Sequence, residues 1–459
     1  MSVNLLLRQY HLLTIFVLCC ALYTAHSVAA IKVIDDVTII KTFKTSPFGI
    51  NMNYIRDHDK NRVAPFVPFT DALALTGTHW VRYPGGQMAD FYRFAVPPYK
   101  IVTASATRKG YQQQAKQNLL YDLNDYLTLI NGSDIEGYFV LPIEEAILDP
   151  ARENEIIEHA KAWLMYVNKH SVKKVTYWEL GNENWKHKDK LEQISQLVGK
   201  MARELKKIDP DIKIGSSVNN KKWAKALSEP AHNLDFIAIS SYANFNKGYR
   251  EYLKSKPQRL ARKANAIAKE LAGTNIELVI AEYNMASRKG EWNSADFGRA
   301  IAFFNLSLEL LKVDQLSKLG AWPTRWMEDR DADTQRDLFN SHNSPTTLGV
   351  SYSLLANNFL AKQHPTLYWD NSLYIYPMSN NNQVNLFIVN KSAEGKQVEL
   401  TFKSELLCNP ETTSLFVGKK DLALKSTFNT LSSFTYIKQK NLSLSVQGNS
   451  IQLVKCENP

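Results

Sequence analysis

The chain has 459 residues, of which 44% are hydrophobic, and its formal net charge is +10. This composition excludes an intrinsically disordered protein, and the length exceeds that of one small domain, so we expect a large α/β barrel with an appended module. The positive net charge favours binding of anionic polymers, either acidic glycans or nucleic acids, but the lysines are scattered along the sequence. A solvated basic surface accounts for them equally well, and we expect no nucleic-acid partner.

Residues 1–30 have the features of a cleaved secretion signal. Arg8 supplies a positive charge, an apolar core runs from residue 12 to residue 22, and small residues follow at Val28-Ala-Ala30. The core is too short to span a membrane, and no later stretch is long and apolar enough to do so. We therefore expect an extracellular or periplasmic protein without stable membrane insertion.

The four cysteines fall into two pairs. Cys19 and Cys20 lie in the signal and would be removed with it; acylation of either one, as in a lipoprotein, is disfavoured because the large Leu18 stands where a small residue is expected. Cys408 and Cys456 remain, and an even pair in an oxidising compartment predicts a disulfide. Two separate buried thiols are the alternative.

After one or two short strands within Ile31–Phe43, short apolar runs alternate with helix-length segments from Ser46 onward. Eight such βα units in roughly 300 residues predict a (β/α)8 TIM barrel, here residues 46–363. A doubly wound open sheet would need an early Gly-rich phosphate turn, which the sequence lacks. The eight predicted strands are Phe48–Tyr54, His79–Tyr83, Ile135–Ile143, Val175–Leu180, Ile212–Ser217, Phe236–Tyr242, Leu278–Tyr283 and Leu319–Trp322.

The clearest helical segments lie between these strands or follow the last of them. They are Glu153–Asn168, Leu191–Ile208, Arg259–Leu271, Ala295–Val313 and Pro345–Ala361.

From about Thr366 the runs become short and strand-like, with no helix-length segment between them. This pattern predicts a C-terminal β-sandwich over residues 364–459, which the cysteine pair would tie together. Residues 31–45 are expected to join the same sandwich, because the termini of a domain often lie close together. The predicted strands are Leu373–Pro377, Gln383–Asn390, Gln397–Phe402, Thr413–Val417, Phe434–Ile437 and Leu442–Val446.

Two predicted strands lead directly to carboxylates. Val175–Leu180 is followed by Gly181-Asn182-Glu183, and Glu282 stands near the end of Leu278–Tyr283. In a TIM barrel the fourth and seventh strands face one another across the mouth, where active residues lie. Two facing carboxylates about 5 Å apart suit a retaining glycosidase, and a wider pair suits an inverting one. A buried ion pair is the structural alternative for each glutamate.

These segments resemble the clan A retaining glycoside hydrolases. The resemblance rests on Trp178-Glu-Leu-Gly-Asn-Glu-Asn-Trp185 and on Val279-Ile-Ala-Glu-Tyr-Asn284. The segment Trp80-Val-Arg-Tyr-Pro-Gly-Gly-Gln-Met-Ala-Asp-Phe-Tyr92 is similar to strand two of the family 51 α-L-arabinofuranosidases and of related family 39 and 79 enzymes. The resemblance implies a saccharide substrate and hydrolysis through a covalent glycosyl-enzyme intermediate.

The resemblance also implies roles for five residues. Glu183 would be the general acid/base and Glu282 the nucleophile. Arg82 would hold the nucleophile's charge, Asn182 would donate to a sugar hydroxyl, and Tyr242 would donate to Glu282. The family often carries His-any-Tyr at this last position, whereas this chain has Ser240-Ser-Tyr242, so the hydrogen bonds around Tyr242 are expected to differ.

Other residues near predicted strand ends are candidates for the sugar pocket. Trp322 suits an aromatic platform for a sugar ring, with simple packing as the alternative. Asn284, Tyr54 and Trp185 are expected to line the pocket, and Gly85-Gly86 allows a close backbone approach to the sugar. The histidines lack ligand-like spacing, so we expect no catalytic metal and no cofactor.

The sequence therefore predicts a secreted retaining glycoside hydrolase acting on a polysaccharide or oligosaccharide. It would be arabinofuranosidase-like or endo-acting, and the basic balance slightly favours acidic or sulfated glycans. A glycan-binding protein that has lost turnover on the same barrel is the alternative.

Overall fold

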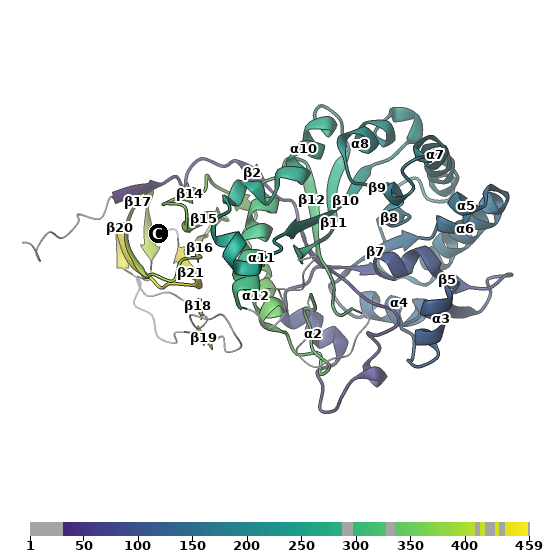
Figure 1. The fold of residues 1–459 in the computed structure, drawn as a ribbon, viewed down its shortest axis with the longest axis horizontal. Coiled ribbons are helices and arrows are strands. Elements are labelled where there is room, and N and C mark those ends of the chain that lie inside the picture. The colour runs from purple at the N-terminus through teal and green to yellow at the C-terminus, as the bar shows by residue number, and fades with distance from the viewer. Residues whose placement is uncertain are drawn as a thin grey trace, which may run out of the picture.

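The computed structural model describes residues 31–286, 297–326, 336–408, 414–417, 427–430 and 437–457. The predicted signal at residues 1–30 lies outside them. Eight strands, all parallel, form a closed barrel on one side of the molecule, and a separate mixed sheet lies beside it (Figure 1). The predicted fold class, a TIM barrel with a C-terminal β-sandwich, is confirmed.

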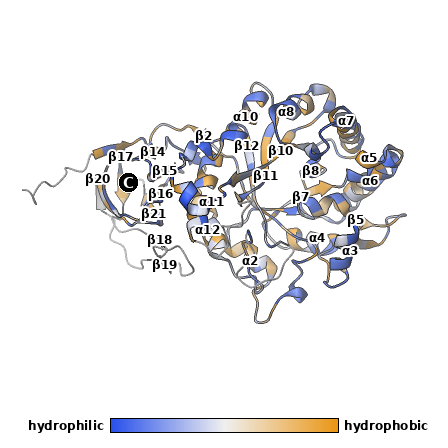
Figure 2. Ribbon diagram, in the orientation of Figure 1, coloured by the Kyte–Doolittle hydropathy of each residue, from blue (hydrophilic) through white to orange (hydrophobic). Residues whose placement is uncertain are grey.

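Each predicted barrel strand is present, displaced by a few residues at its ends. The strands are β3 (Phe48–Asn51), β4 (Trp80–Tyr83), β7 (Glu136–Leu141), β8 (Tyr177–Leu180), β9 (Lys213–Val218), β10 (Phe236–Asn244), β11 (Glu277–Ala286) and β12 (Leu316–Ala321). They read as nearly continuous apolar runs because parallel strands are covered on both faces. The apolar colour of β7 and β10 beside the mixed colours of the outer helices follows this rule (Figure 2).

The helices surround the barrel. The α-helices are α2 (Phe69–Leu75), α3 (Lys109–Ala115), α4 (Leu123–Asn131), α5 (Glu144–Leu148), α6 (Glu153–His170), α7 (Leu191–Ile208), α8 (Lys221–Leu227), α9 (Gly248–Leu253), α10 (Arg262–Leu271), α11 (Phe297–Leu311) and α12 (Thr347–Ala356). The 3-10 turns are η1 (Asp59–Asn61), η2 (Gln87–Phe91), η3 (Pro150–Arg152), η4 (Asn184–Lys186), η5 (Pro230–His232) and η6 (Pro257–Arg259). The helix α7 has the predicted bounds, because its apolar residues recur with helical spacing and are buried.

Aromatic side chains fill the barrel near the N-terminal ends of its strands. Trp80, Tyr138 and Phe236 are fully buried there, and the Trp80 and Tyr138 rings lie 5.2 Å apart. A Cβ atom on Gly49 would lie 2.1 Å from the Trp80 ring, so the large indole requires glycine on the neighbouring strand. The barrel is a packed core rather than a pore, and the site must lie at its mouth.

A hairpin that the sequence did not predict follows β4. It consists of β5 (Tyr92–Ala95) and β6 (Val102–Ala106), which pair only with each other. Together with η2 it makes the connection after the second barrel strand unusually long, on the side of the barrel where β4 ends.

The second sheet contains both ends of the described chain. Its strand β1 runs parallel to β17, and β2 pairs with β13, so residues near the N-terminus complete a sheet built from the C-terminal region. The predicted domain boundaries stay a prediction. The strands are β1 (Ile31–Ile34), β2 (Lys41–Thr42), β13 (Lys362–Gln363), β14 (Leu367–Tyr368), β15 (Leu373–Ser379), β16 (Gln383–Asn390), β17 (Lys396–Cys408), β18 (Ser414–Val417), β19 (Thr427–Thr430), β20 (Ile437–Val446) and β21 (Ser450–Glu457).

The predicted Cys408–Cys456 disulfide is present and joins β17 to β21. The sheet also packs directly on the barrel helices. The Tyr249 hydroxyl of α9 donates to the Lys391 carbonyl, and the Tyr376 hydroxyl of β15 donates to Glu309 of α11. Among the described residues, no helix has both the length and the apolar character that a membrane crossing requires.

Candidate active site

The two predicted catalytic carboxylates lie where β8 and β11 open at the mouth of the barrel. Glu183 follows β8 by three residues and has left-handed backbone angles (φ 50°, ψ 41°). This conformation is uncommon for a residue with a side chain and usually marks a position with a special task. Glu282 lies within β11, beside Ser240 of β10, at an irregularity in the strand pairing. Such irregularities re-aim side chains next to active sites.

Arg82 of β4 organises the centre of the site. Its Nη1 donates to Glu282 Oε1 at 3.0 Å and to Asn51 Oδ1 at 2.9 Å. Its Nε donates to Glu179 Oε2 at 2.8 Å, and its Nη2 donates to Asn182 Oδ1 at 3.0 Å. The guanidinium is only 1% exposed, so these charge-assisted bonds form away from water, where they are strongest. Arg82 thus holds the Glu282 carboxylate and the Asn182 amide in fixed positions.

The second oxygen of Glu282 is held by Tyr242 of β10, whose hydroxyl donates to Glu282 Oε2 at 2.9 Å. Both carboxylate oxygens therefore receive a hydrogen bond. Ser240, which stands where the family often has histidine, accepts a bond from Lys263 Nζ on its main-chain oxygen at 2.7 Å. With serine at this position Tyr242 still bonds the carboxylate, and a lysine of α10 contacts the main chain of β10.

The backbone at Gly86 lies against Glu282. A Cβ atom there would come within 2.5 Å of Glu282 Oε1 and within 2.4 Å of the Trp322 ring, so a residue with a side chain would displace one of them. Trp322 is thereby placed beside the carboxylate, although it is only 4% exposed and also contacts Trp326, with ring centroids 5.2 Å apart. Its use as a sugar platform stays a prediction.

The side-chain amide nitrogen of Asn182 is a hydrogen-bond donor without a partner among the described residues. Its side-chain oxygen is occupied by Arg82 and its backbone N–H donates to Asp90 Oδ1 at 2.9 Å, but within the described residues its buried Nδ2 has no hydrogen-bond partner. Leaving a buried donor unpaired costs about 1–3 kcal/mol. A ligand hydroxyl would satisfy this donor, and the amide is already oriented by Arg82.

The charges at the mouth interact strongly. Burial raises the pKa of Glu282 to about 7; the Arg82 guanidinium opposes this shift, the Glu183 carboxylate adds to it, and the Tyr242 hydrogen bond opposes it. Glu183 is more accessible, with its side chain 19% exposed, and its Oε2 lies 2.6 Å from Lys186 Nζ. The two glutamates are thus unlike: one is buried and clamped, and the other is reachable and paired with a lysine.

Asn284 is one of the residues predicted to line the pocket. Asn284 is fully buried; its amide nitrogen donates to the carbonyls of Trp322 and Arg336, and its oxygen accepts from Arg299 at 3.1 Å. These hydrogen bonds join β11 to neighbouring segments, and that Asn284 also lines the pocket stays a prediction. Its position two residues after Glu282 indicated a place in the pocket, whereas the polar atoms of its side chain bond other parts of the protein.

Tyr54 is also fully buried and packs on Tyr92, with ring centroids 4.7 Å apart. Trp185 is half-buried, and its ring lies 5.9 Å from Lys263 Nζ. That these two residues line the pocket stays a prediction.

Several residues of the site were not expected from the sequence. Asn51 and Glu179 bind Arg82, Asp90 binds the backbone of Asn182, and Lys186 and Lys263 bring positive charge to the glutamates. Glu179 had a detectable signal, since a carboxylate in the middle of a buried strand needs a buried partner. The lysines had none, because only the folded loops bring them to the mouth.

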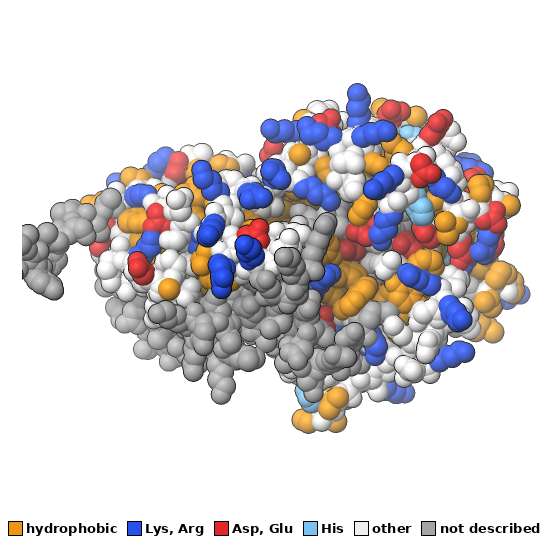
Figure 3. Space-filling model, viewed as in Figure 1, with side chains coloured by type: hydrophobic (Ala, Val, Ile, Leu, Met, Phe, Trp, Pro, Cys, Tyr) orange, Lys and Arg blue, Asp and Glu red, His pale blue; other side chains and the backbone are white. Residues whose placement is uncertain are grey.

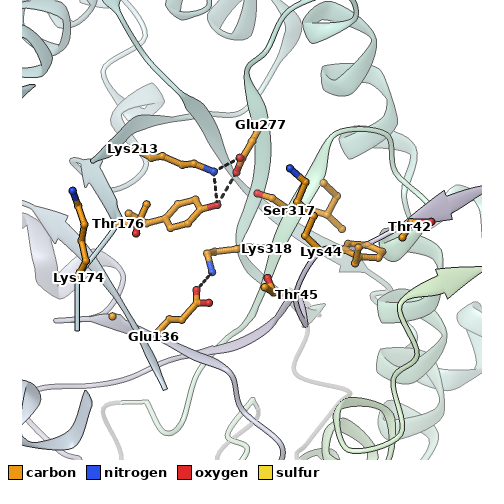
Figure 4. A pocket seen from close by; sticks show the side chains of 14 residues that line it. Thr42, Lys44, Thr45, Glu136, Lys174, Thr176, Lys213, Glu277, Ser317 and Lys318 are labelled. Atoms are coloured by element: carbon orange, nitrogen blue, oxygen red, sulfur yellow. Dashed lines mark hydrogen bonds and ion pairs between the residues drawn. The ribbon is translucent and has the colours of Figure 1, made fainter. Parts of the chain in front are cut away.

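A hollow of about 490 Å³ lies at the opposite, N-terminal end of the barrel. Four of its charged side chains pair with each other: Lys318 Nζ lies 2.6 Å from Glu136 Oε2, and Lys213 bonds Glu277 (Figure 4). In a TIM barrel the residues at the N-terminal end of the strands serve stability, whereas the active site lies at the C-terminal end. The mutual pairing of these residues fits a structural role.

Comparison with known proteins identifies the fold. No family model matches the sequence, and no curated protein sequence matches it. Among solved structures, the α-L-arabinofuranosidase of Thermotoga maritima aligns with a TM-score of 0.72 at 12% identity, covering 93% of this chain and 99% of that one. This protein has the fold of the family 51 α-L-arabinofuranosidases. A family 51 α-L-arabinofuranosidase of Bifidobacterium longum aligns with a TM-score of 0.63 at 14% identity, covering 94% and 99% of the two chains.

The likeness extends to an enzyme of another specificity. A monomeric β-xylosidase of Caulobacter crescentus aligns with a TM-score of 0.58 at 10% identity, covering 93% of this chain and 99% of that one. Since these neighbours share the fold at such low identity, the chemistry of this chain has to be argued from its own residues.

Proposed function

We propose that this protein is a retaining glycoside hydrolase. The observation that carries the proposal is the pair of unlike carboxylates at the mouth: Glu282, held through both oxygens, and Glu183, more accessible and paired with Lys186. Retaining hydrolysis needs such a pair, with one fixed nucleophile and one residue that handles protons. The glycosidase fold of the structural neighbours supports the same conclusion, as does the buried Asn182 donor, which has no partner among the described residues.

In the first step, the Glu282 carboxylate attacks the anomeric carbon as the bond to the leaving oxygen breaks, and Glu183 donates its proton to that oxygen. The product is a glycosyl ester on Glu282 and a free alcohol. In the second step, Glu183 takes a proton from water, the hydroxide attacks the same carbon, and the ester bond breaks. Both carboxyl groups return to their starting states, and two inversions leave the anomeric configuration unchanged.

The Lys186 ion pair has a consequence for this cycle. A proton donor must carry a proton, whereas an ammonium 2.6 Å away stabilises the charged carboxylate. We therefore expect the ion pair to open before Glu183 donates its proton.

The stereochemistry of the first product tests the proposal. A panel of nitrophenyl glycosides that includes α-L-arabinofuranoside identifies a cleaved sugar, and proton NMR recorded during the first turnovers identifies its anomer. We expect the product to keep the configuration of the substrate. An inverted anomer would remove the nucleophile role of Glu282, and binding of glycans without any sugar release would favour the inactive, glycan-binding alternative.

The Tyr242→Phe variant tests the electrostatics of Glu282. The tyrosine hydroxyl stabilises the charged carboxylate, so its loss should raise the pKa of Glu282 further above its ordinary value. Because the nucleophile must be ionised, the acid limb of kcat/KM should move to higher pH, by about 1–2 units for one hydrogen bond to a charged group. Tyr249→Phe, which removes a buried hydroxyl that donates to the Lys391 carbonyl, is the control and should leave the limb in place. An unmoved limb in Tyr242→Phe would contradict the assignment.

Export is part of the proposal, since residues 1–30 have the features of a cleaved signal. The mass of the mature chain checks it.

A further inference from the structure

Positive charge continues from the catalytic mouth onto α10. Lys263, on the first turn of this helix, is half-buried and donates to the Ser240 carbonyl. Burial lowers the pKa of Lys263, and both Glu183 and Glu282 oppose that shift, so this lysine lies within electrostatic reach of both carboxylates. Lys263 is therefore the point at which the mouth of the barrel and the surface of α10 meet.

Two hollows adjoin α10, and Lys263 lines the first of them. The first has a volume of about 230 Å³, and its lining includes Tyr242, Lys263, Arg259 and Arg262. It thus begins at the tyrosine that holds Glu282 and is walled by three basic side chains. The second, of about 340 Å³, is lined by the same two arginines and also by Lys221 and Lys269. We call these five basic residues, Lys263, Arg259, Arg262, Lys221 and Lys269, the cationic track.

Most residues of the cationic track come from one strongly basic segment of the sequence. Residues 247–270 contain eight lysines and arginines and two glutamates, a net +6 within a chain whose total is +10. Four of the eight, Arg259, Arg262, Lys263 and Lys269, lie on η6 and α10, and folding brings Lys221 of α8 to the same hollow. Figure 3 shows Lys and Arg side chains gathered along the top edge of the barrel, over α8 and α10.

Folding does not neutralise the centre of the track. Within the described ranges of the chain, neither Arg259 nor Arg262 forms an ion pair with a carboxylate, and both are exposed. The contrast with the other end of the barrel is informative, because there Lys318 and Lys213 are each paired with a glutamate. Two guanidinium groups shared by two adjacent hollows are suited to a ligand that carries several anionic groups in succession.

We propose that the cationic track binds carboxylate or sulfate groups of a polysaccharide whose neighbouring sugar lies between Glu183 and Glu282. The substrate would then be an anionic glycan chain that extends beyond the catalytic mouth. This inference rests on the proposed glycosidase function for the position of the cleaved sugar, but binding of the chain to the track does not depend on turnover. A polysaccharide fits better than a nucleic acid, because the lining of the two hollows offers Tyr242 and Phe245 but no run of aromatic platforms on which bases stack.

Binding of defined polymers by the whole mature chain tests the proposal. Isothermal titration calorimetry would compare polygalacturonate and chondroitin sulfate with a neutral arabinan of similar length. We expect the two anionic polymers to bind at least about tenfold more tightly than the neutral one, and the Arg259→Ala/Arg262→Ala variant to lose about tenfold or more of that affinity. Reducing-end release measured on the same polymers reports turnover separately, so a failure of catalysis is distinguished from a failure of the track.

Arg250→Ala/Lys254→Ala is the matched control, since it removes two exposed charges from the same basic segment but outside both hollows. Its affinity should fall by less than about threefold if the track is a specific site. Equal losses in the two double variants would overturn the proposal in favour of diffuse charge attraction. Equal binding of neutral and anionic glycans would overturn it as well, as would single-stranded DNA of similar length binding as tightly as the anionic glycans.

Discussion

Glu282→Ala is expected to lower kcat on a nitrophenyl glycoside by about 10⁴-fold or more, the scale seen when a covalent nucleophile is removed. The loss is this large because no other described carboxylate lies between Arg82 and Tyr242, where the attacking oxygen is held. The truncated side chain leaves a space in which a small anion fits. Added azide should therefore attack the anomeric carbon directly and yield a glycosyl azide of inverted configuration.

Glu183→Ala is the matched comparison, because it removes the proton-handling carboxylate and leaves the nucleophile. With a good leaving group the glycosyl ester still forms, and azide should then intercept it to give a glycosyl azide of retained configuration. Proton NMR of the two azides checks both expectations. A retained azide from Glu282→Ala together with an inverted azide from Glu183→Ala would show that Glu183 is the nucleophile and Glu282 the acid/base. Near-normal turnover in Glu282→Ala would contradict the proposed glycosidase mechanism.

Arg82→Met is expected to lower the free energy of unfolding by about 3–5 kcal/mol, the range for removing one partner of a buried ion pair. Arg82 is the cation bonded to both Glu179 and Glu282, and all three side chains are nearly or fully buried. Without the guanidinium, the buried carboxylates of Glu179 and Glu282 repel each other and have no counter-ion. Urea denaturation at neutral pH measures the loss, which should shrink as the pH is lowered, since protonation removes the unpaired charges.

The Arg152→Met variant is the control for the Arg82 experiment. Arg152 also pairs with two glutamates, Glu145 and Glu155, but its side chain is 39% exposed, so the change should cost less than about 1 kcal/mol. Equal and small losses in the two variants would contradict the assignment of Arg82 as the buried counter-ion of the site.

The barrel strands were predictable because a parallel strand is covered on both faces and reads as an apolar run whatever its neighbours are. The helix α7 was predictable for a similar reason, since its buried residues recur with helical spacing. The hairpin β5–β6 was missed because its strands are only four and five residues long and pair only with each other, and such short segments give a weak periodic signal.

The sequence by itself determined the fold class and the positions of Glu183 and Glu282, because both follow from apolar runs that end in a carboxylate. It did not determine what surrounds them. The sequence did not predict the bonds by which Asn284 joins β11 to its neighbours, nor the contacts of Glu179 and Lys186 at the site. Only the tertiary structure decided these contacts and collected the basic residues of α10 into a track beside the mouth. The physical reason is that hydrogen bonds and ion pairs depend on distances of a few ångströms between segments that lie far apart in the sequence; Arg82 and Glu282, for example, are 200 residues apart.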